Sequence, residues 1–362
     1  MKIGIVTYHR SQNYGAMLQA YGLRRFLSEC GYDVRFVDYW PEHQRNIYRL
    51  FSWRDFCRVG VRGKARMLKR LLKSLPETLS RRRKFKTFFG KELLPYCAKT
   101  TDVFDAIIYG SDQIWRKQMV EQRYNPVYFG QNDFHSRRRI SYAASMGILS
   151  TNPEDGKIVL SLVQNLDAIS VRDAGLKTYL NNLGVANVEW TIDPVFLPSP
   201  TSWSSLAGDS PLVPGPYLLF YDLNQGAFRD DAIESFANNS GMRVVRIGKT
   251  SLPAWRRGCR GEFGPYEFLN LVKFSTFVVS SSYHGDCFSI LFHKPFLTAF
   301  PRNPQRALSL LSELGLQNRL IDSAEQSVSA GAAIDWTAVD RRISQLKNRS
   351  IAWLAKALEP IQ

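Results

Sequence analysis

The chain has 362 residues, of which 44% are hydrophobic, and carries a formal net charge of +16. This is enough sequence for two domains with sizeable cores. It contains no run of about 18 apolar residues and no signal-peptide pattern in its first residues, MKIGIVTYHR, so we expect a cytoplasmic protein without a transmembrane helix. Its five cysteines lack the spacing of a disulfide framework or a zinc site, and we expect no metal or other cofactor.

Strand and helix patterns alternate from the first residue. The segment KIGIVTY is typical of a strand, the next helical pattern is closed by Gly31, and DVRFVDY predicts a second strand. After a basic stretch, strand patterns return in the segments VFDAIIY, RRISYAASMG, AISVRDAG and VEWTIDPVF. This alternation predicts a parallel sheet with helices on both faces.

Residues 197–216, LPSPTSWSSLAGDSPLVPGP, are rich in proline, serine and glycine, and we interpret 201–216 as a linker without regular structure. Strands and helices alternate again over 217–330, and a last amphipathic helix is expected within 331–362. The predicted fold is α/β, with two doubly wound Rossmann-like domains (1–200 and 217–330) that face each other across a cleft, as in GT-B proteins. The C-terminal helix is expected to pack back on the N-terminal domain.

The excess positive charge is concentrated at 58–92, where thirteen Lys and Arg stand against two acidic residues. Apolar residues recur there at helical spacing, namely Met67, Leu68, Leu71, Leu72 and Leu75. One interpretation is a basic helical insert that lies on an anionic membrane surface. A solvated helical face is the alternative. Nucleic acid is a less favoured partner, because no recognised RNA-binding or DNA-binding motif accompanies the charge.

Polar residues follow several predicted strands. They are Asn13, Tyr14 and Gly15, then Ser111, Asp112 and Gln113, then Arg172, and finally the segment SSYHGD at 281–286. Ligands of open α/β sheets bind outside the carboxyl ends of the strands, although polar loops are also common without a function. Gly15 and Gly285 lie near helix N-termini, which favour anions, and Arg172 is a cation that suits a carboxylate or phosphate. We therefore expect a small anionic ligand. No GxGxxG or GxxxxGK[ST] motif supports a dinucleotide or Walker-type site.

Several segments occur in the order seen in one known family: NYGAMLQAYGL, FDAIIYGSDQIW, ISYAASMG, ISVRDAG, TIDPVFL and SSYHGDCFSILFHKPF. With these motifs the chain resembles the polysaccharide pyruvyl transferase family from about Lys2 to Arg319. The resemblance implies a GT-B-like fold and transfer of a pyruvyl group from phosphoenolpyruvate to a sugar hydroxyl or hydroxyl pair, which yields a ketal. The acceptor would be a glycan or a lipid-linked sugar of cell-surface polysaccharide or exopolysaccharide synthesis, at the inner face of the cell membrane.

By the same resemblance, Arg172 and His284 would bind the donor, with His284 on the C-terminal side of the cleft. One further basic residue is expected there, with Lys294, Arg302 and Arg306 as candidates, and Gly285 would let the donor approach closely. The N-terminal domain would hold the acceptor through the residues around Gly15 and Asp112. His284 would protonate C3 of the enol, because the pKa of histidine lies near neutral pH. Asp112 or Asp286 would take the acceptor's proton, or serve only as loop and helix caps.

Two other functions remain open at this point. One is a GT-B glycosyltransferase that uses a nucleotide sugar. The other is a non-catalytic basic protein that binds RNA or membranes.

Overall fold

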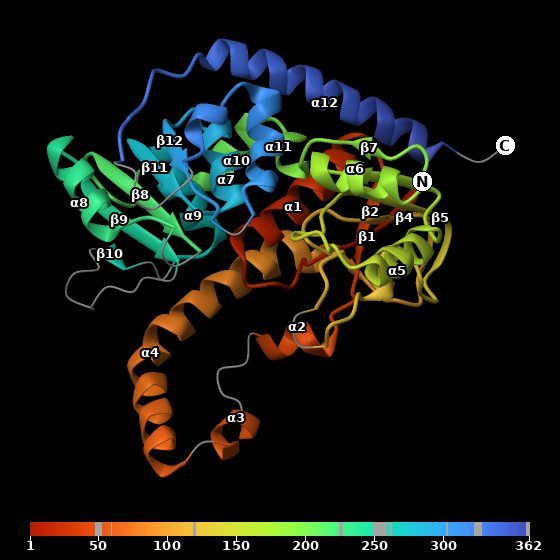
Figure 1. Cartoon of the computed structure of the whole chain (residues 1–362), viewed down its shortest axis with the longest axis horizontal. Helices are drawn as coiled ribbons and strands as arrows, with labels where there is room; N and C mark the ends of the chain where they lie inside the picture. Colours follow the sequence, from red (N-terminus) through yellow and green to blue (C-terminus); the bar gives the residue numbers. More distant parts are fainter. Residues whose placement is uncertain are drawn as a thin grey trace.

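The computed structural model describes residues 1–47, 53–58, 60–118, 121–223, 227–248, 259–260, 263–301, 303–321 and 328–359. Two parallel sheets lie in the two halves of the molecule, with a long helix across both of them and a second one that leaves the body (Figure 1).

The N-terminal sheet has seven parallel strands in the order β3-β2-β1-β4-β5-β6-β7. They are β1 (Lys2–Val6), β2 (Asp33–Val37), β3 (Cys97–Ala98), β4 (Val103–Tyr109), β5 (His135–Ala144), β6 (Ala168–Val171) and β7 (Glu189–Trp190). One core contains Ile5 and Ile108 with residues of helix α1 (Tyr14–Glu29), and another contains Ile107 with residues of α5 (Pro153–Val163) and α6 (Ala174–Asn182). Because Ile107 and Ile108 are neighbours on one strand, these cores cover opposite faces of the sheet.

The C-terminal sheet has five parallel strands in the order β10-β9-β8-β11-β12. Its strands are β8 (Tyr217–Asp222), β9 (Arg243–Gly248), β10 (Cys259–Arg260), β11 (Phe277–Ser280) and β12 (Phe296–Thr298). The helices are α8 (Asp230–Asn239), α9 (Pro265–Phe274), α10 (Tyr283–Leu291) and α11 (Gln305–Leu314). Side chains of α9 and α10 share a core with one face of the sheet, while Ile233 of α8 packs on the other.

The predicted α/β class with two doubly wound sheets is confirmed. Strands β3 and β10 were not predicted, because two residues are too few to produce a periodic pattern. The strand expected over 188–196 is only Glu189–Trp190, since Asp193 and Pro194 begin a short 3-10 helix there.

The prediction of an irregular linker over 201–216 is wrong for its first part, which is helix α7 (Pro200–Ala207). Pro200 occupies the first turn, where a missing N–H costs nothing, and Ser199 caps the helix through its hydroxyl. Trp203 of α7 is fully buried against Tyr21 of α1 and Phe288 of α10. This segment therefore belongs to the core in which the two halves meet.

Helix α12 (Trp336–Leu358) lies across both halves (Figure 1). At its start, Asp340 bonds the ring of His293 from the C-terminal half at 2.9 Å. Further along, the Ser350 hydroxyl accepts the backbone N–H of Ile192 at 2.9 Å, and Trp353 packs near Tyr142. The C-terminal helix thus contacts the N-terminal half as well as the half that precedes it.

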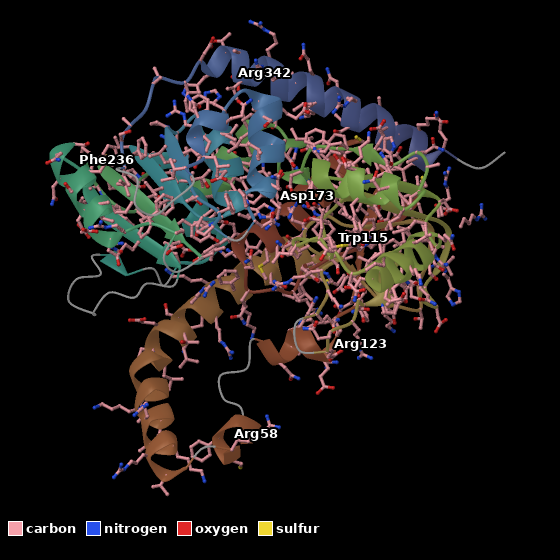
Figure 2. The ribbon with its side chains drawn as sticks, in the orientation of Figure 1. Arg58, Trp115, Arg123, Asp173, Phe236 and Arg342 are labelled. Carbon is pink, nitrogen blue, oxygen red and sulfur yellow. The ribbon has the colours of Figure 1, made fainter. Side chains whose placement is uncertain are left out.

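The basic insert contains the short helices α2 (Glu42–Ile47) and α3 (Trp53–Arg58) and the long helix α4 (Val61–Phe88). Helix α4 runs outward from the junction of the two halves (Figure 1), and Figure 2 shows Arg58 of α3 far from both sheets. Two further short turns, Phe89–Leu93 and Leu94–Tyr96, return the chain to the sheet. In the part of the chain that the structure describes, no helix has both the length and the apolar character needed to cross a bilayer.

Candidate active site

The candidate site lies at the carboxyl ends of strands from both sheets. Asp112 follows β4, Arg172 follows β6, and Asp193 lies three residues beyond β7. From the other half, His284 lies in the first turn of α10, directly after β11. These positions are where open parallel sheets bind ligands, and the junctions β1/β4 and β8/β11 are the switch points of the two sheets.

Arg172 is the centre of this cluster. Its side chain is fully buried, and its Nη1 lies 2.5 Å from Asp193 Oδ2 while Nη2 lies 3.0 Å from Asp112 Oδ1. The guanidinium also packs on the ring of Tyr283, 4.6 Å from its centroid. Both terminal nitrogens therefore already have carboxylate partners, so Arg172 organises the site more than it offers free donors to a ligand.

The electrostatics of the two carboxylates follow from this pairing. Burial alone would raise the pKa of Asp193, but the charges of Arg172 and His284 outweigh it and hold that pKa well below its ordinary value. Asp112 shows the same balance, with burial opposed by Arg172, His284 and Arg306, and its pKa is also lowered. Both side chains are thus carboxylates near neutral pH.

His284 connects the two halves of the molecule. Its Nε2 lies 3.5 Å from Arg172 Nη1 and 3.6 Å from Asp193 Oδ2. Its Nδ1 faces Gly15 of α1 so closely that a Cβ on Gly15 would lie 2.0 Å from that atom. The residue is only 6% exposed, because the opposing helix covers the ring.

The loop after β4 has a mainly structural role apart from Asp112. Ser111 is fully buried, and its hydroxyl donates to the carbonyl of Ala143 at 2.6 Å. The backbone carbonyl of Gln113 accepts the hydroxyl of Tyr8, and its side chain packs close to Gly147. Asp112, with 15% of its side chain exposed, is the residue of this loop with both charge and access.

The predicted basic residues fall in three different places. Arg306, in the first turn of α11, is partly buried and lies over Tyr283, 5.5 Å from the ring centroid. Lys294 follows the far end of α10, nine residues beyond Gly285, and the structure does not bring it to the cluster. Arg302 lies outside the described residues.

Arg306 has an unbalanced charge. Burial, followed by the charge of Arg172, lowers its pKa, and the carboxylates of Asp173 and Asp112 do not compensate. Its buried Nε has no hydrogen-bond partner, and no carboxylate among the described residues lies within ion-pair distance of it. This is the arrangement expected where an anion completes the site.

Gly285 and Asp286 face the interior of the C-terminal half. A Cβ on Gly285 would lie 2.2 Å from Ser280 Oγ, so this glycine allows α10 to pack on β11. Asp286 is 1% exposed and accepts the Thr298 hydroxyl at 3.1 Å, with its Oδ1 unpartnered. Burial raises its pKa well above the ordinary value, which disfavours the ionised form that a base needs.

Two residues expected on the acceptor side are engaged in the fold. The side-chain oxygen of Asn13 caps α1 by accepting the N–H of Ala16 at 3.1 Å. Tyr14 is buried where the halves meet: its ring stacks on Phe268 at 4.8 Å, and its hydroxyl donates to the carbonyl of Phe263. Both hold Gly15, and through it His284, in place.

The sequence analysis named neither Asp193 nor Asp173 as a site residue, and it included Tyr283 only as part of the segment SSYHGD. Asp193 stood in the segment TIDPVFL, where an Asp before Pro is typical of a turn and attracts no attention. Asp173 bonds the Ser145 hydroxyl at 2.5 Å, has an unpartnered Oδ1, and lies near the middle of the molecule (Figure 2). In the sequence, only the position of Asp173 directly after Arg172 pointed to the site. Cys287, next to the site in sequence, is fully buried, and burial raises the pKa of its thiol well above the ordinary value.

A separate cluster near the ends of β1, β2 and β3 brings ligand atoms of His9, Asp38 and Cys97 within 4.8 Å of one another. Arg10 holds both oxygens of Asp38, at 2.5 and 2.6 Å, and burial raises the pKa of the Cys97 thiol to about 11. The carboxylate is occupied and the thiol is protonated, so we assign no metal to this cluster.

A two-sheet α/β protein whose charged residues converge on the junction of its halves belongs to the class that binds ligands between two domains. The sequence model of the polysaccharide pyruvyl transferases matches residues 13–303. The chain belongs to this family and is a transferase of polysaccharide biosynthesis. No protein of curated function matches it by sequence.

Solved structures that align with the chain include a UDP-GlcNAc 2-epimerase and a heptosyltransferase. A UDP-GlcNAc 2-epimerase from Neisseria meningitidis, bound to UDP-GlcNAc, has a TM-score of 0.45 at 10% identity, over 99% of this chain and 94% of that one. The E. coli heptosyltransferase WaaC with ADP has a TM-score of 0.39 at 12% identity, over 96% of this chain and 100% of that one. We base no argument on these distant similarities.

Proposed function

We propose that the protein transfers the pyruvyl group of phosphoenolpyruvate to a sugar hydroxyl or hydroxyl pair of a cell-surface polysaccharide or exopolysaccharide precursor. Family membership supports a transferase with a glycan acceptor. The observation that carries the donor assignment is Arg306, a partly buried cation next to Arg172 whose Nε has no partner. Phosphoenolpyruvate has a carboxylate and a phosphate on one small carbon frame, which suits such a site.

The reaction needs a proton on the donor and bases for the acceptor. Protonation of C3 turns the enol methylene into a methyl group and leaves C2 electron-deficient. A sugar oxygen then bonds to C2 and loses its proton. The C2–O bond to phosphate breaks, and a second sugar hydroxyl that loses its proton closes the ketal. Of the two protons lost by the hydroxyls, one replaces the proton given to C3 and the other leaves with the phosphate. One donor and two hydroxyls thus give one ketal and one hydrogen phosphate ion, so neither oxidant nor reductant is required.

His284 is the proposed proton donor to C3, because it lies in the charged cluster where the two halves meet and the pKa of histidine is ordinarily near neutral pH. Asp193, at 3.6 Å from Nε2, would orient the ring and balance the charge of its protonated form. Asp112 is the proposed base for the acceptor hydroxyl, since it is ionised and partly exposed. Arg306 would hold the donor's anionic groups and stabilise the departing phosphate.

We also propose that the N-terminal half binds the acceptor, through Asp112 and the neighbouring loop ends, and that the C-terminal half binds the donor. Transfer would take place at the inner face of the cell membrane, on a lipid-linked sugar. The support for this location is the concentration of positive charge in the insert that contains α4.

Arg306→Gln provides the test of the donor site. Glutamine keeps hydrogen-bonding groups but has no charge, so the affinity for phosphoenolpyruvate should fall by about 10- to 100-fold, as expected when a charge-assisted contact of ~1.5–3 kcal/mol is lost. Calorimetric titration measures this affinity. Lys294→Gln, beyond the far end of α10, is the matched control and should bind as the wild type does. Equal affinity of Arg306→Gln and Lys294→Gln would remove Arg306 from the donor site.

A further inference from the structure

Helix α4 combines an anchored end with a free end. At its C-terminal end Phe85 and Phe88 are buried in the core between the two halves, and Lys84 Nζ lies 3.1 Å from Glu267 Oε1 of α9. Toward its N-terminus the helix extends away from the body (Figure 1). Pro76 lies inside the helix, where it removes one backbone hydrogen bond and permits the helix to bend.

The free end of α4 exposes a stripe of apolar side chains. Val61, Leu68, Leu72 and Leu79 follow one another at intervals of seven, four and seven residues, so they line one face of the helix. Their exposed fractions are 82%, 48%, 62% and 40%. Leu75 is partly buried, and the side chains of Met67 and Leu71 lie outside what the structure describes. Four exposed aliphatic residues on one helix face indicate a surface that something else covers.

The charge of α4 restricts what can cover this stripe. The helix contains eleven Lys and Arg and one acidic residue, Glu77, and so contributes +10 to the net charge of the chain. Arg62, Arg66 and Lys69 are exposed on the same segment of the helix. A second copy would bring two equally charged helices together, which is unfavourable. An anionic lipid surface supplies both the negative charge and the apolar layer that the two kinds of side chain need.

We propose that the free part of α4, Val61–Leu79, docks the protein on an anionic membrane, with its leucine stripe inserted at the level of the headgroups. This inference rests on the proposed function in that a lipid-linked acceptor would be presented there. It differs from a general attraction of the basic insert to the membrane because it assigns binding to specific exposed leucines. It also excludes Arg81 and Lys84 from lipid contact, since they are engaged with Gln12 and Glu267 in the body.

Co-sedimentation with vesicles tests the proposal, with mixed phosphatidylglycerol and phosphatidylcholine vesicles compared with pure phosphatidylcholine. Glutamine keeps the helix, so Leu68→Gln/Leu72→Gln should remain folded while it loses affinity for the anionic vesicles by at least about ten-fold per leucine. Arg62→Gln/Arg66→Gln/Lys69→Gln should lose about 10²-fold in total. Leu212→Gln changes a leucine that is 52% exposed outside α4, and it should bind as the wild type does.

Three results would overturn the proposal. Unchanged vesicle binding by the leucine variant would mean that charge alone attracts the protein. The stripe would be assigned to a second copy by two results together. The leucine variant and Leu212→Gln would bind vesicles equally, and only the leucine variant would change from dimer to monomer. Binding to RNA but not to vesicles would assign the helix to nucleic acid. Phosphoenolpyruvate titrations of the same variants should match the wild type, so failure of the donor proposal is distinguishable from failure of the docking proposal.

Discussion

At the scale of single residues, His284 is the group on which the proposed chemistry depends. It lies against Gly15 on one side and near Arg172 and Asp193 on the other. His284→Asn keeps a hydrogen-bonding side chain of similar size but cannot deliver a proton near neutral pH. Turnover should fall by ~10²–10⁴-fold, while the affinity for phosphoenolpyruvate changes little. Phosphate release at saturating substrates, with calorimetry for the donor, measures both quantities.

The matched control for His284 is His293→Asn. His293 lies just beyond the other end of the same helix, stacks on Trp336 and bonds Asp340, so its loss should leave turnover intact. Wild-type turnover of His284→Asn would move the proton donor elsewhere. Complete loss of donor binding would instead make His284 an anion-binding residue.

The buried carboxyl of Asp286 should make the free energy of unfolding depend on pH. Because burial raises its pKa in the folded protein, the folded state keeps this proton at pH values where the unfolded chain has lost it. Its stabilising contribution is therefore complete below about pH 3.9, the usual pKa of a free Asp, and is lost as the pH rises toward the folded pKa. Asn cannot ionise, so Asp286→Asn should gain free energy of unfolding relative to the wild type as the pH rises above about 3.9.

Urea unfolding at several pH values measures this difference for Asp286→Asn and for the control Asp209→Asn, whose side chain is fully exposed. Parallel stability curves for the wild type and Asp286→Asn would show that Asp286 is not protonated in the folded state.

At the scale of elements, the contact between α1 and α10 positions His284, and Gly15→Ala tests it. Alanine is about 1 kcal/mol more favourable than glycine inside a helix, so α1 itself should not suffer. The added Cβ would nonetheless lie 2.0 Å from His284 Nδ1 and must displace the ring. A displacement of about 1 Å can reduce turnover by ~10²-fold, which we expect for Gly15→Ala.

Gly175→Ala is the control for this contact. Gly175 also lies at the start of a helix, but the nearest atom to its Cβ position is 3.8 Å away, so this variant should keep wild-type turnover. Equal turnover of Gly15→Ala and Gly175→Ala would show that the α1–α10 contact does not matter for catalysis.

Elements were predictable where a local pattern was long enough. The strands before Arg172 and His284 contain runs of apolar and β-branched residues, so the sequence placed both side chains at strand ends, as the structure does. The sequence did not predict helix α7, because the prolines, serines and glycines of its segment resemble a linker. The burial of Trp203 between α1 and α10 explains why a helix forms there. That burial depends on contacts remote in sequence, which no local pattern contains.

At the scale of the whole molecule, the cluster exists only because two sheets are brought together. Arg172 and Asp193 come from one half, and His284 and Arg306 from the other, more than 90 residues away along the chain. The charge of Arg172 predicted an anionic ligand, and the resemblance to the family assigned the residue to the donor. It could not show that Asp112 and Asp193 already pair with both of its terminal nitrogens, or that Arg306 is left without such a partner.

The thermal stability of the whole protein with different donors tests the central claim most directly. A ligand that binds only the folded state stabilises it by about 2.7 kcal/mol at ~100 times its Kd. We predict that phosphoenolpyruvate, without added metal, raises the melting temperature of the wild type and raises that of Arg306→Gln much less, while UDP- and GDP-sugars have no effect on either. An unchanged melting temperature with saturating phosphoenolpyruvate, together with an increase caused by a nucleotide sugar, would contradict the account and favour a glycosyltransferase.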